Sequence, residues 1–266
     1  GSVGSLDDAA SVTVLSGNAV DVQDAISIQG ISGYVGAGDL DIQDNASRLI
    51  SAGDSVLNKS GVDVISTNES TVDANIGAQL DAFTADIEFN VTDNAANILT
   101  EVNATGRDGT ELNEANDVIV TDSVSGASYS GMSSSSISSS GDTITVEEAK
   151  IIQDITNYNA SASDYDIRDN SAAIISAKDD VLANGRIEVE VTNDVGASDG
   201  AILNAFTADI DFDVSDTAVN LAAQVNGTNG IAGSLDDART VTVESGTAIG
   251  ASDAEAIQAI SGYSGA

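Results

Sequence analysis

Short segments in which apolar and polar residues alternate recur along the whole chain. In residues 209–214, Ile210, Phe212 and Val214 alternate with aspartates. A period of two residues is typical of a β-strand with one buried face. The sequence therefore predicts strands over ten segments: 12–14, 40–42, 62–64, 87–91, 118–120, 144–146, 165–167, 187–191, 210–214 and 241–243.

The alternating segments are followed by a turn and then by a short run with helical spacing. Two such runs place their apolar residues on one face of a helix: Ala95, Ile98, Leu99 and Val102 in one, and Ala218, Leu221, Ala222 and Val225 in the other. The turn commonly holds an aspartate, as at Asp44, Asp93, Asp169 and Asp216. An aspartate directly before a helix accepts its first amide hydrogens, so we expect these residues to be N-caps.

The sequence repeats itself over a long period. Residues 4–14 (GSLDDAASVTV) return at 233–243 (GSLDDARTVTV), and Tyr34 falls on Tyr263, a displacement of 229 residues. Because the second copy ends where the first one continues, we expect the chain to be a piece of a longer array. Nine strand-to-strand steps fill this period, which gives a unit of about 25 residues, within the range of solenoid repeats.

A shorter echo lies inside the long period. Residues 82–97 return at 205–220, displaced by 123, and residues 39–57 return at 164–182, displaced by 125. Small insertions between the two offsets are expected when insertions fall in loops.

A unit of this length has room for one strand and one short helix, but not for a hairpin partner. Successive strands would then be parallel and joined by right-handed crossovers. The sequence predicts an α/β fold, a repeat solenoid with one short parallel strand and one short helix per rung, continuous over residues 1–266. A parallel β-helix is the alternative, favoured if the apparent helices are strands and turns.

One segment departs from this pattern. Residues 123–141 are rich in serine and have no helical stripe. We interpret them as a loop or extended segment in place of a helix, with a sugar-bearing or contact loop as the alternative.

The charge limits the partners. Lys and Arg total 8 against 43 Asp and Glu, a net charge of −35. Phosphate binding needs clustered cations, so nucleic acid is excluded as a partner, and an anionic membrane surface is disfavoured. No apolar run is long enough for insertion into a membrane. The acidic balance points instead to cations such as calcium, or to high ionic strength that screens the self-repulsion.

Carboxylates on the polar side of the predicted strands are the candidate metal ligands. In a parallel sheet they would lie close together and repel one another. The residues concerned are Asp41, Asp63, Asp166, Asp211 and Asp213. Two interpretations stay open: a solvated face screened by salt, or bound calcium, which takes six to eight hard oxygen ligands. Asp93 and Asp216 could also be ligands, but the cap role explains them better.

Catalysis finds little support in the residue types. The chain has no His and no Cys, which removes the common general base, the thiol nucleophile and zinc–thiolate sites. Asp211 and Asp213 are the sort of carboxylate pair that a glycosidase uses, but an exposed, repeated strand offers no pocket around them. We expect that the protein is not an enzyme.

The recurring element at 91–97 (VTDNAAN) and 214–220 (VSDTAVN) resembles the repeats of very large bacterial cell-surface and secreted proteins, such as those of marine cyanobacteria and proteobacteria. Segments 118–141 and 144–158 lack the full motif. The resemblance implies an extracellular or cell-surface location and a surface, matrix or filament role, and it supplies no catalytic residues.

The leading hypothesis is a structural module of an adhesin, a surface layer or a filament. Its partners would be neighbouring copies stacked head to tail. The alternatives are a module that binds calcium or a glycan, and a carbohydrate-active enzyme.

Overall fold

The computed structural model of this 266-residue chain describes residues 6, 8–15, 17–36, 39–104, 112–121, 143–227, 234–244, 246 and 248–265. The serine-rich segment 123–141 therefore lies outside the described residues, as does part of the first GSLDDA copy. Within the described ranges the fold is mixed α/β, with ten helices and several short sheets, and no sheet closes into a barrel. Every strand pair is parallel, which confirms the predicted strand direction.

The chain divides into two compact units, and each is described by itself. The first holds residues 1–93, 97–120 and 154–159, and the second holds residues 94–96, 121–153 and 160–266. Helix α5, Ala95–Val102, begins in the second unit and continues in the first.

The first unit has two two-stranded sheets, β1–β2 and β3–β4. Its other elements in chain order are α1 (Val22–Gln29), β1 (Leu40–Asp44), α2 (Ala46–Ala52), α3 (Asp54–Leu57), β2 (Val62–Thr67), α4 (Ala74–Asp81), β3 (Asn90–Asp93) and β4 (Asp117–Val120).

The second unit has a four-stranded sheet, β5–β6–β7–β8, and a three-stranded sheet, β9–β10–β11. Its elements in chain order are β5 (Thr143–Ile144), α6 (Val146–Gln153), β6 (Asp164–Asp169), α7 (Ser171–Leu182), β7 (Arg186–Val191), α8 (Ala197–Leu203), β8 (Ile210–Asp211), β9 (Asp213–Thr217), α9 (Ala218–Val225), β10 (Thr240–Glu244), α10 (Ala251–Gln258) and β11 (Tyr263–Gly265).

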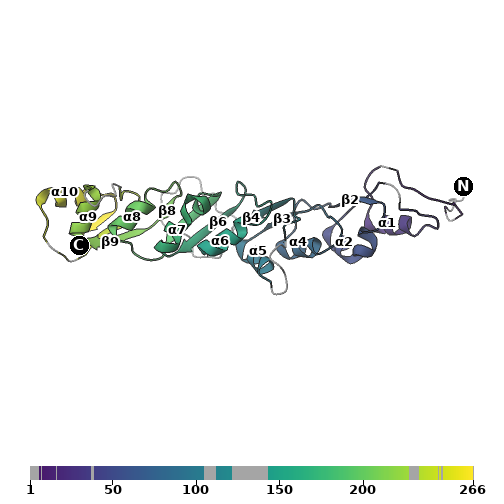
Figure 1. The fold of residues 1–266 in the computed structure, drawn as a ribbon, viewed down its shortest axis with the longest axis horizontal. Helices are drawn as coiled ribbons and strands as arrows, with labels where there is room; N and C mark the ends of the chain where they lie inside the picture. Colours follow the sequence, from purple (N-terminus) through teal and green to yellow (C-terminus); the bar gives the residue numbers. More distant parts are fainter. Residues whose placement is uncertain are drawn as a thin grey trace. The chain divides into compact units, whose positions relative to one another are not determined.

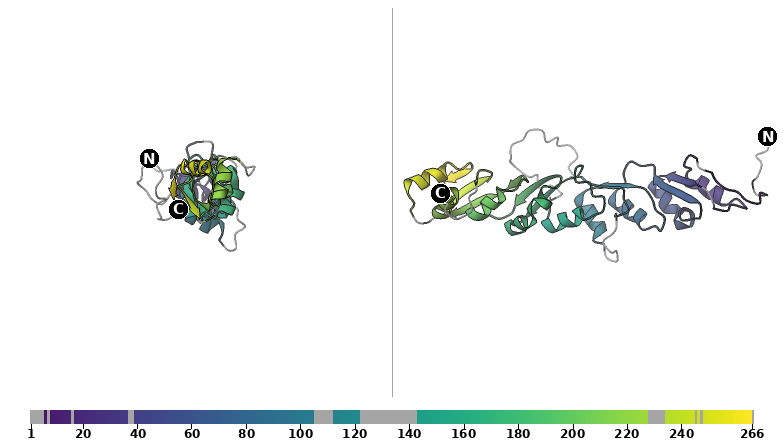
Figure 2. Two further views of the ribbon diagram at one scale, coloured as in Figure 1. Left: turned by 90° about the vertical axis from the view of Figure 1, so that its left-hand side faces the viewer. Right: turned by 45° about the horizontal axis from the view of Figure 1, so that its top comes forward.

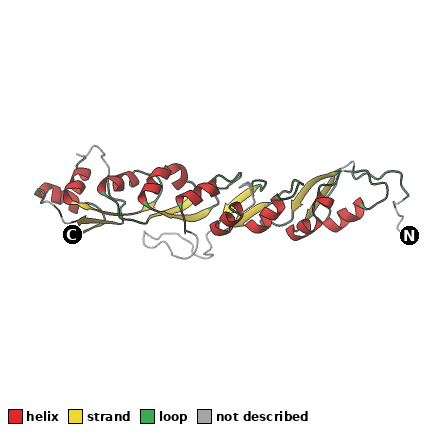
Figure 3. Ribbon diagram, turned by 60° about the horizontal axis from the view of Figure 1, so that its bottom comes forward, coloured by secondary structure: helices red, strands yellow, loops and turns green. Residues whose placement is uncertain are grey.

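The described helices and strands form two layers within each unit. The helices lie along one side of the strands (Figure 3). In the first unit α2 contacts α1, α3 and α4, and in the second unit each helix from α6 to α10 contacts the next one along the chain (Figures 1 and 2). The core lies between the two layers, where Tyr165, Phe89 and Phe212 are among the largest fully buried side chains.

The predicted helical runs are helices. Ala95, Ile98, Leu99 and Val102 of α5 are all buried. In α9 only part of the predicted stripe is buried, because Val225 at its last turn is 38% exposed. The parallel β-helix alternative required these runs to be strands and turns, so it is wrong for the described residues.

One predicted strand is divided between two sheets. Residues 210–214 alternate without interruption, yet β8 pairs with β7 whereas β9 pairs with β10. Phe212, between them, is fully buried. The alternation identified the buried face correctly, but it carried no information on which strand each half would pair with.

The long sequence period recurs in the pairing. Val12 forms a parallel bridge with Tyr34, and Val241 pairs in parallel with Tyr263, which is the same pair 229 residues later. Val118 bridges Tyr158 in the same way. The local geometry therefore repeats where the sequence repeats.

The shorter period also recurs, down to one backbone conformation. Gly53, between α2 and α3, has φ 66° and ψ 175°. Lys178, displaced by 125 residues, interrupts α7 with φ 58° and ψ −178°. This conformation suits glycine and strains any other residue, so the lysine occupies a position built for glycine.

Candidate functional site

The five predicted metal ligands lie on the polar face of their strands. Asp41 is in β1 and Asp63 in β2 of the first unit, whereas Asp166 in β6, Asp211 in β8 and Asp213 in β9 belong to the second. Asp63 is exposed and the other four are half-buried, while their apolar strand neighbours such as Ile42, Ile167 and Phe212 are buried. Strand alternation therefore placed Asp41, Asp166, Asp211 and Asp213 on the expected face. In β2 the predicted alternation is wrong, because Val64 is 39% exposed and Ile65 is buried in its place.

The register brings several carboxylates next to one another. Asp166 pairs with Glu188 across β6 and β7, and Glu190 pairs with Asp211 across β7 and β8. Adjacent strands are about 4.8 Å apart, so these carboxylates repel unless something compensates them.

In the second unit arginine side chains compensate Glu190 and Asp213. Arg168 of β6 donates through Nε to Glu190 Oε2 at 2.8 Å, and Arg239 approaches Glu190 Oε1 at 3.8 Å through Nη1. Arg239 also forms a two-pronged ion pair with Asp213, donating through Nη2 to Oδ2 and through Nε to Oδ1 at 3.2 Å. The result is a chain of alternating charges, Arg168–Glu190–Arg239–Asp213, which we call the ion ladder.

The ion ladder is the feature that sequence reasoning missed. The acidic excess of the whole chain drew attention to cations from solution, although three of the eight basic residues lie in or directly before the strands concerned: Arg168, Arg186 and Arg239. Arg168 lies at a polar position of β6, and the β6–β7 register puts it opposite Glu190. Its sequence position was a usable signal; the contact of Arg239 depends on how distant segments pair.

The pKa values of Asp211 and Asp213 move in opposite directions. Burial raises the pKa of Asp211, and the nearby carboxylates of Asp209, Glu190 and Asp213 add to this against the lowering effect of Arg239. Hydrogen bonds from Arg239 lower the pKa of Asp213 in spite of its burial, and Thr240, whose Oγ1 donates to Asp213 Oδ1 at 2.7 Å, contributes in the same direction.

These environments bear on metal binding. Both carboxylate oxygens of Asp213 already accept hydrogen bonds from Arg239, and Asp211 binds a proton more readily than an ordinary aspartate. Among the residues that the structure describes, no group of three or more Asp, Glu, His or Cys side chains is arranged to hold a metal ion. Calcium binding at the five aspartates stays a prediction.

The aspartates at the strand ends cap helices, but not the helices that follow them. Asp216 of β9 accepts the backbone N–H of Ala197, the first residue of the preceding helix α8, at 2.9 Å. The N-cap of the following helix, α9, is Thr217. The predicted cap role is thus correct in kind and wrong in direction.

The same bond recurs at three other strand ends. Each carboxylate accepts the first backbone N–H of the helix that precedes its own strand. The pairs are Val22 N to Asp44 at 3.2 Å, Ala74 N to Asp93 at 3.0 Å and Val146 N to Asp169 at 3.2 Å. We call these three bonds and that of Asp216 the carboxylate clamps.

The loops after the helices are held in a related way. Asp54 accepts the backbone N–H of Thr84 at 3.1 Å and its hydroxyl at 2.9 Å. The repeat-equivalent Asp179 accepts the N–H of Thr207 at 2.9 Å. Side chains of one strand–helix segment therefore accept hydrogen bonds from backbone donors of the next one.

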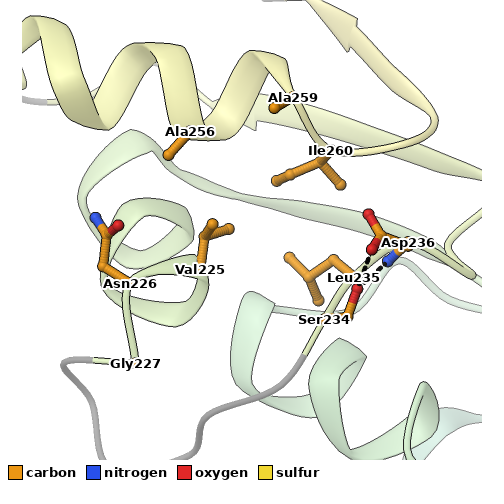
Figure 4. Close-up of a pocket in the computed structure, with 9 residues that line it drawn as sticks. All are labelled: Val225, Asn226, Gly227, Ser234, Leu235, Asp236, Ala256, Ala259 and Ile260. Carbon is orange, nitrogen blue, oxygen red and sulfur yellow. Dashed lines mark hydrogen bonds between the residues drawn. The ribbon is translucent and has the colours of Figure 1, made fainter.

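One open pocket lies at the C-terminal end of α9. Figure 4 shows Val225, Leu235 and Ile260 around it, with Asn226 and Asp236 at its edge. Asp236 accepts a hydrogen bond from the hydroxyl of Ser234 (Figure 4). The pocket offers an apolar floor and little chemistry. Among the described residues, every helix is too short or too polar to cross a lipid bilayer.

No protein-family model and no curated protein matches this sequence.

Proposed function

We propose that the chain is a structural repeat module of an extracellular or cell-surface protein, of the kind that builds an adhesin, a surface layer or a filament. In this proposal each strand and the helix that follows it form one layer, and the layers stack as a solenoid. The proposal is of a load-transmitting or spacing element and not of an enzyme.

The carboxylate clamps carry the proposal. Each one joins the strand of one layer to the helix of the layer before it, and they recur in both units at equivalent sequence positions. A contact that is made only between neighbouring layers lets length grow by the addition of layers, which is how repeat proteins are stabilised.

The ion ladder supports the same role. It spans β6, β7 and β9 together with the residue before β10, so it links successive strands along the polar face of the second unit. A bidentate Arg–carboxylate pair in a network contributes more than an isolated surface pair.

The enzyme alternative rests on Asp211 and Asp213. Opposed pKa shifts are the pattern of an acid–base pair, but Arg239 and Thr240 occupy the oxygens of Asp213. We therefore propose that these residues stabilise the strands. Incubation with a panel of polysaccharides should give no products, and turnover that disappears in Asp211→Asn would support the carbohydrate-active alternative instead.

Two measurements test the structural role. Small-angle X-ray scattering of the chain should give a radius of gyration above the roughly 18 Å of a compact domain of this length. Antibodies against the chain should label intact source cells or their extracellular material. A compact particle, or labelling only after the cells are lysed, would contradict the proposal.

A further inference from the structure

Three leucines occupy the same place in the repeat but differ in exposure. Leu6, Leu112 and Leu235 each stand six positions before a valine that pairs in parallel with a tyrosine, at Val12, Val118 and Val241. Leu112 and Leu235 are 0% and 1% exposed, whereas Leu6 is 55% exposed. The valines follow the same trend, because Val118 and Val241 are fully buried and Val12 is only half-buried.

In the second unit the residues that cover Leu235 belong to helix α8 and to the strand segment 210–214 that follows it. A Cβ placed on Gly200 of α8 would lie 3.1 Å from Leu235 Cδ2 and 2.9 Å from Val214 Cγ2. Leu235 thus packs against a helix surface that is open only because Gly200 has no side chain. Phe212, on the strand side, lies 3.5 Å from the same point.

The first unit builds the same cover over Leu112. A Cβ on Gly77 of α4 would lie 3.0 Å from Leu112 Cδ2 and 2.7 Å from Val91 Cγ2, with Phe89 at 3.4 Å. In both units the leucine is therefore covered by the same residues, a glycine of a helix and the Phe and Val of a Phe-x-Val strand segment.

Backbone N–H groups near the leucine also donate hydrogen bonds to the segment that covers it. The N–H of Arg239 donates to the carbonyl of Phe212 at 2.8 Å, and the N–H of Asp237 donates to Asn204 Oδ1 at 2.8 Å. In the first unit, Asn116 donates to Phe89 at 2.8 Å and Glu114 to Asp81 Oδ1 at 2.9 Å. The corresponding N–H groups near Leu6 are those of Ala10 and Asp8.

We propose that the face formed by Leu6, Ala9 and Val12 is a docking surface for a helix–strand segment like residues 197–217, supplied by a further copy of this repeat. The inference rests on the proposed function and adds the identity of the docking segment. The face repeats the one that such a segment covers at Leu112 and at Leu235, and it presents equivalent apolar and backbone groups. The docked segment would bring the glycine, the Phe-x-Val strand and the side-chain acceptor after its helix.

The absence of cysteine from the chain allows a direct test. Single variants Leu6→Cys, Leu112→Cys and Leu235→Cys are each treated with a thiol-specific reagent under native conditions. Leu6→Cys is then also placed in an extended chain, in which a copy of residues 164–232 directly precedes Gly4. This reproduces the natural junction before Gly233.

We expect Leu6→Cys to react rapidly in the original chain. In the extended chain it should react at least about 100-fold more slowly, the protection given by an opening equilibrium constant near 0.01. The matched control carries Phe212→Asp and Val214→Asp in the added copy only, and it should restore rapid reaction. As a second measurement, Leu6→Asp should leave the Tm of the original chain unchanged and lower that of the extended chain by roughly 5 °C or more.

The outcomes separate the two proposals. Rapid reaction of Leu6→Cys in the extended chain, with Leu112→Cys and Leu235→Cys protected, would overturn the docking surface and leave the stacked layers intact. Slow reaction of Leu6→Cys in the original chain would also overturn it, because the face would already be covered. Rapid reaction of Leu112→Cys and Leu235→Cys would overturn the layered arrangement itself.

Discussion

Asp216 Oδ2 accepts the backbone N–H of Ala197 at 2.9 Å, across nineteen residues of sequence. Its other oxygen accepts the N–H of Thr217 and the side-chain amide of Asn220, both at 2.7 Å. One carboxylate thus starts helix α8 and fixes the entry into helix α9. Because α8 begins after Gly196, which has no capping side chain, Asp216 supplies the side-chain cap that Gly196 lacks.

Replacing Asp216 by alanine should leave these donors without their acceptor. We expect Asp216→Ala to lower the free energy of unfolding by about 2 kcal/mol, the cost of a lost helix cap together with a charge-assisted hydrogen bond. Urea unfolding followed by circular dichroism measures it. Asp180→Ala is the control, since Asp180 is exposed and a surface change of this kind stays within about 0.5 kcal/mol. Equal effects of the two variants would refute the role of the clamp.

Lys178 should be better replaced by glycine. It has φ 58° and ψ −178°, the conformation that Gly53 adopts at the equivalent position. Relief of about 1–3 kcal/mol of strain outweighs the entropic cost of glycine, about 0.5–1 kcal/mol, so Lys178→Gly should stabilise the chain by roughly 1 kcal/mol.

Lys150→Gly is the matched control for this substitution. It removes the same charge from a regular helix, α6, where glycine is less favourable than other residues. Thermal unfolding should therefore move in opposite directions for the two variants, and a decrease in Tm for both would contradict the strain argument.

Gly200 should not tolerate even a methyl group. An added Cβ would approach Val214 Cγ2 to 2.9 Å and Leu235 Cδ2 to 3.1 Å, and all three residues are buried. Overpacking of this kind costs about 1–3 kcal/mol, more than the helix propensity that alanine gains. We expect Gly200→Ala to lower the denaturant midpoint. Gly17→Ala, at an exposed position with only an ordinary contact, should leave it nearly unchanged.

Local patterns account for the parts of the fold that could be predicted. Alternation placed Ile210 and Phe212 on the buried face, and helical spacing placed Ile98 in the core. Both patterns report only which side of an element is covered. They could not show that β8 and β9 join different sheets.

In the candidate site, too, local sequence patterns predicted which face a residue lies on but not its distant partners. Four of the five candidate carboxylates were placed on the correct face, because strand alternation is local; the alternation around Asp63 fails where Ile65 and not Val64 is buried. The pairing of Glu190 with Arg239 was not foreseen, since it depends on the register between segments that are distant in sequence. The clamp of Asp216 was assigned to the following helix for the same reason, because capping rules consider neighbours in the chain and not the helix of the layer before.

Replacement by asparagine should change the stability of the chain in opposite directions at Asp211 and at Asp213. The pKa of Asp211 is raised in the folded chain, so its contribution to stability is present below the unfolded pKa of about 3.9 and is lost as the pH rises through the folded value. At pH 7 the charged form is therefore unfavourable, and Asp211→Asn should be as stable as the original chain or more so.

Asp213 has a lowered pKa. Its contribution is present above the unfolded value and is lost as the pH falls through the folded one. Asp213→Asn, which breaks the pair with Arg239, should cost about 1 kcal/mol at pH 7, and the cost should shrink as the pH falls below about 4. Urea unfolding of both variants at pH 7 and at pH 3 tests this, and changes of the same sign at pH 7 would contradict it.

The net charge of −35 should make stability depend on ionic strength. Salt screens repulsion between exposed carboxylates over a Debye length of about 10 Å at 0.1 M, so the Tm should rise as sodium chloride increases. Calcium chloride is then compared with magnesium chloride and with sodium chloride at equal ionic strength. If the acidic strand faces are only screened, the three salts should follow one curve, apart from a modest extra effect that both divalent ions share. A saturable rise specific to calcium, reduced by Asp63→Asn or Asp166→Asn, would instead support calcium bound at the strand aspartates. Asp180→Asn, which removes an exposed charge from a helix, separates loss of a ligand from a change in net charge.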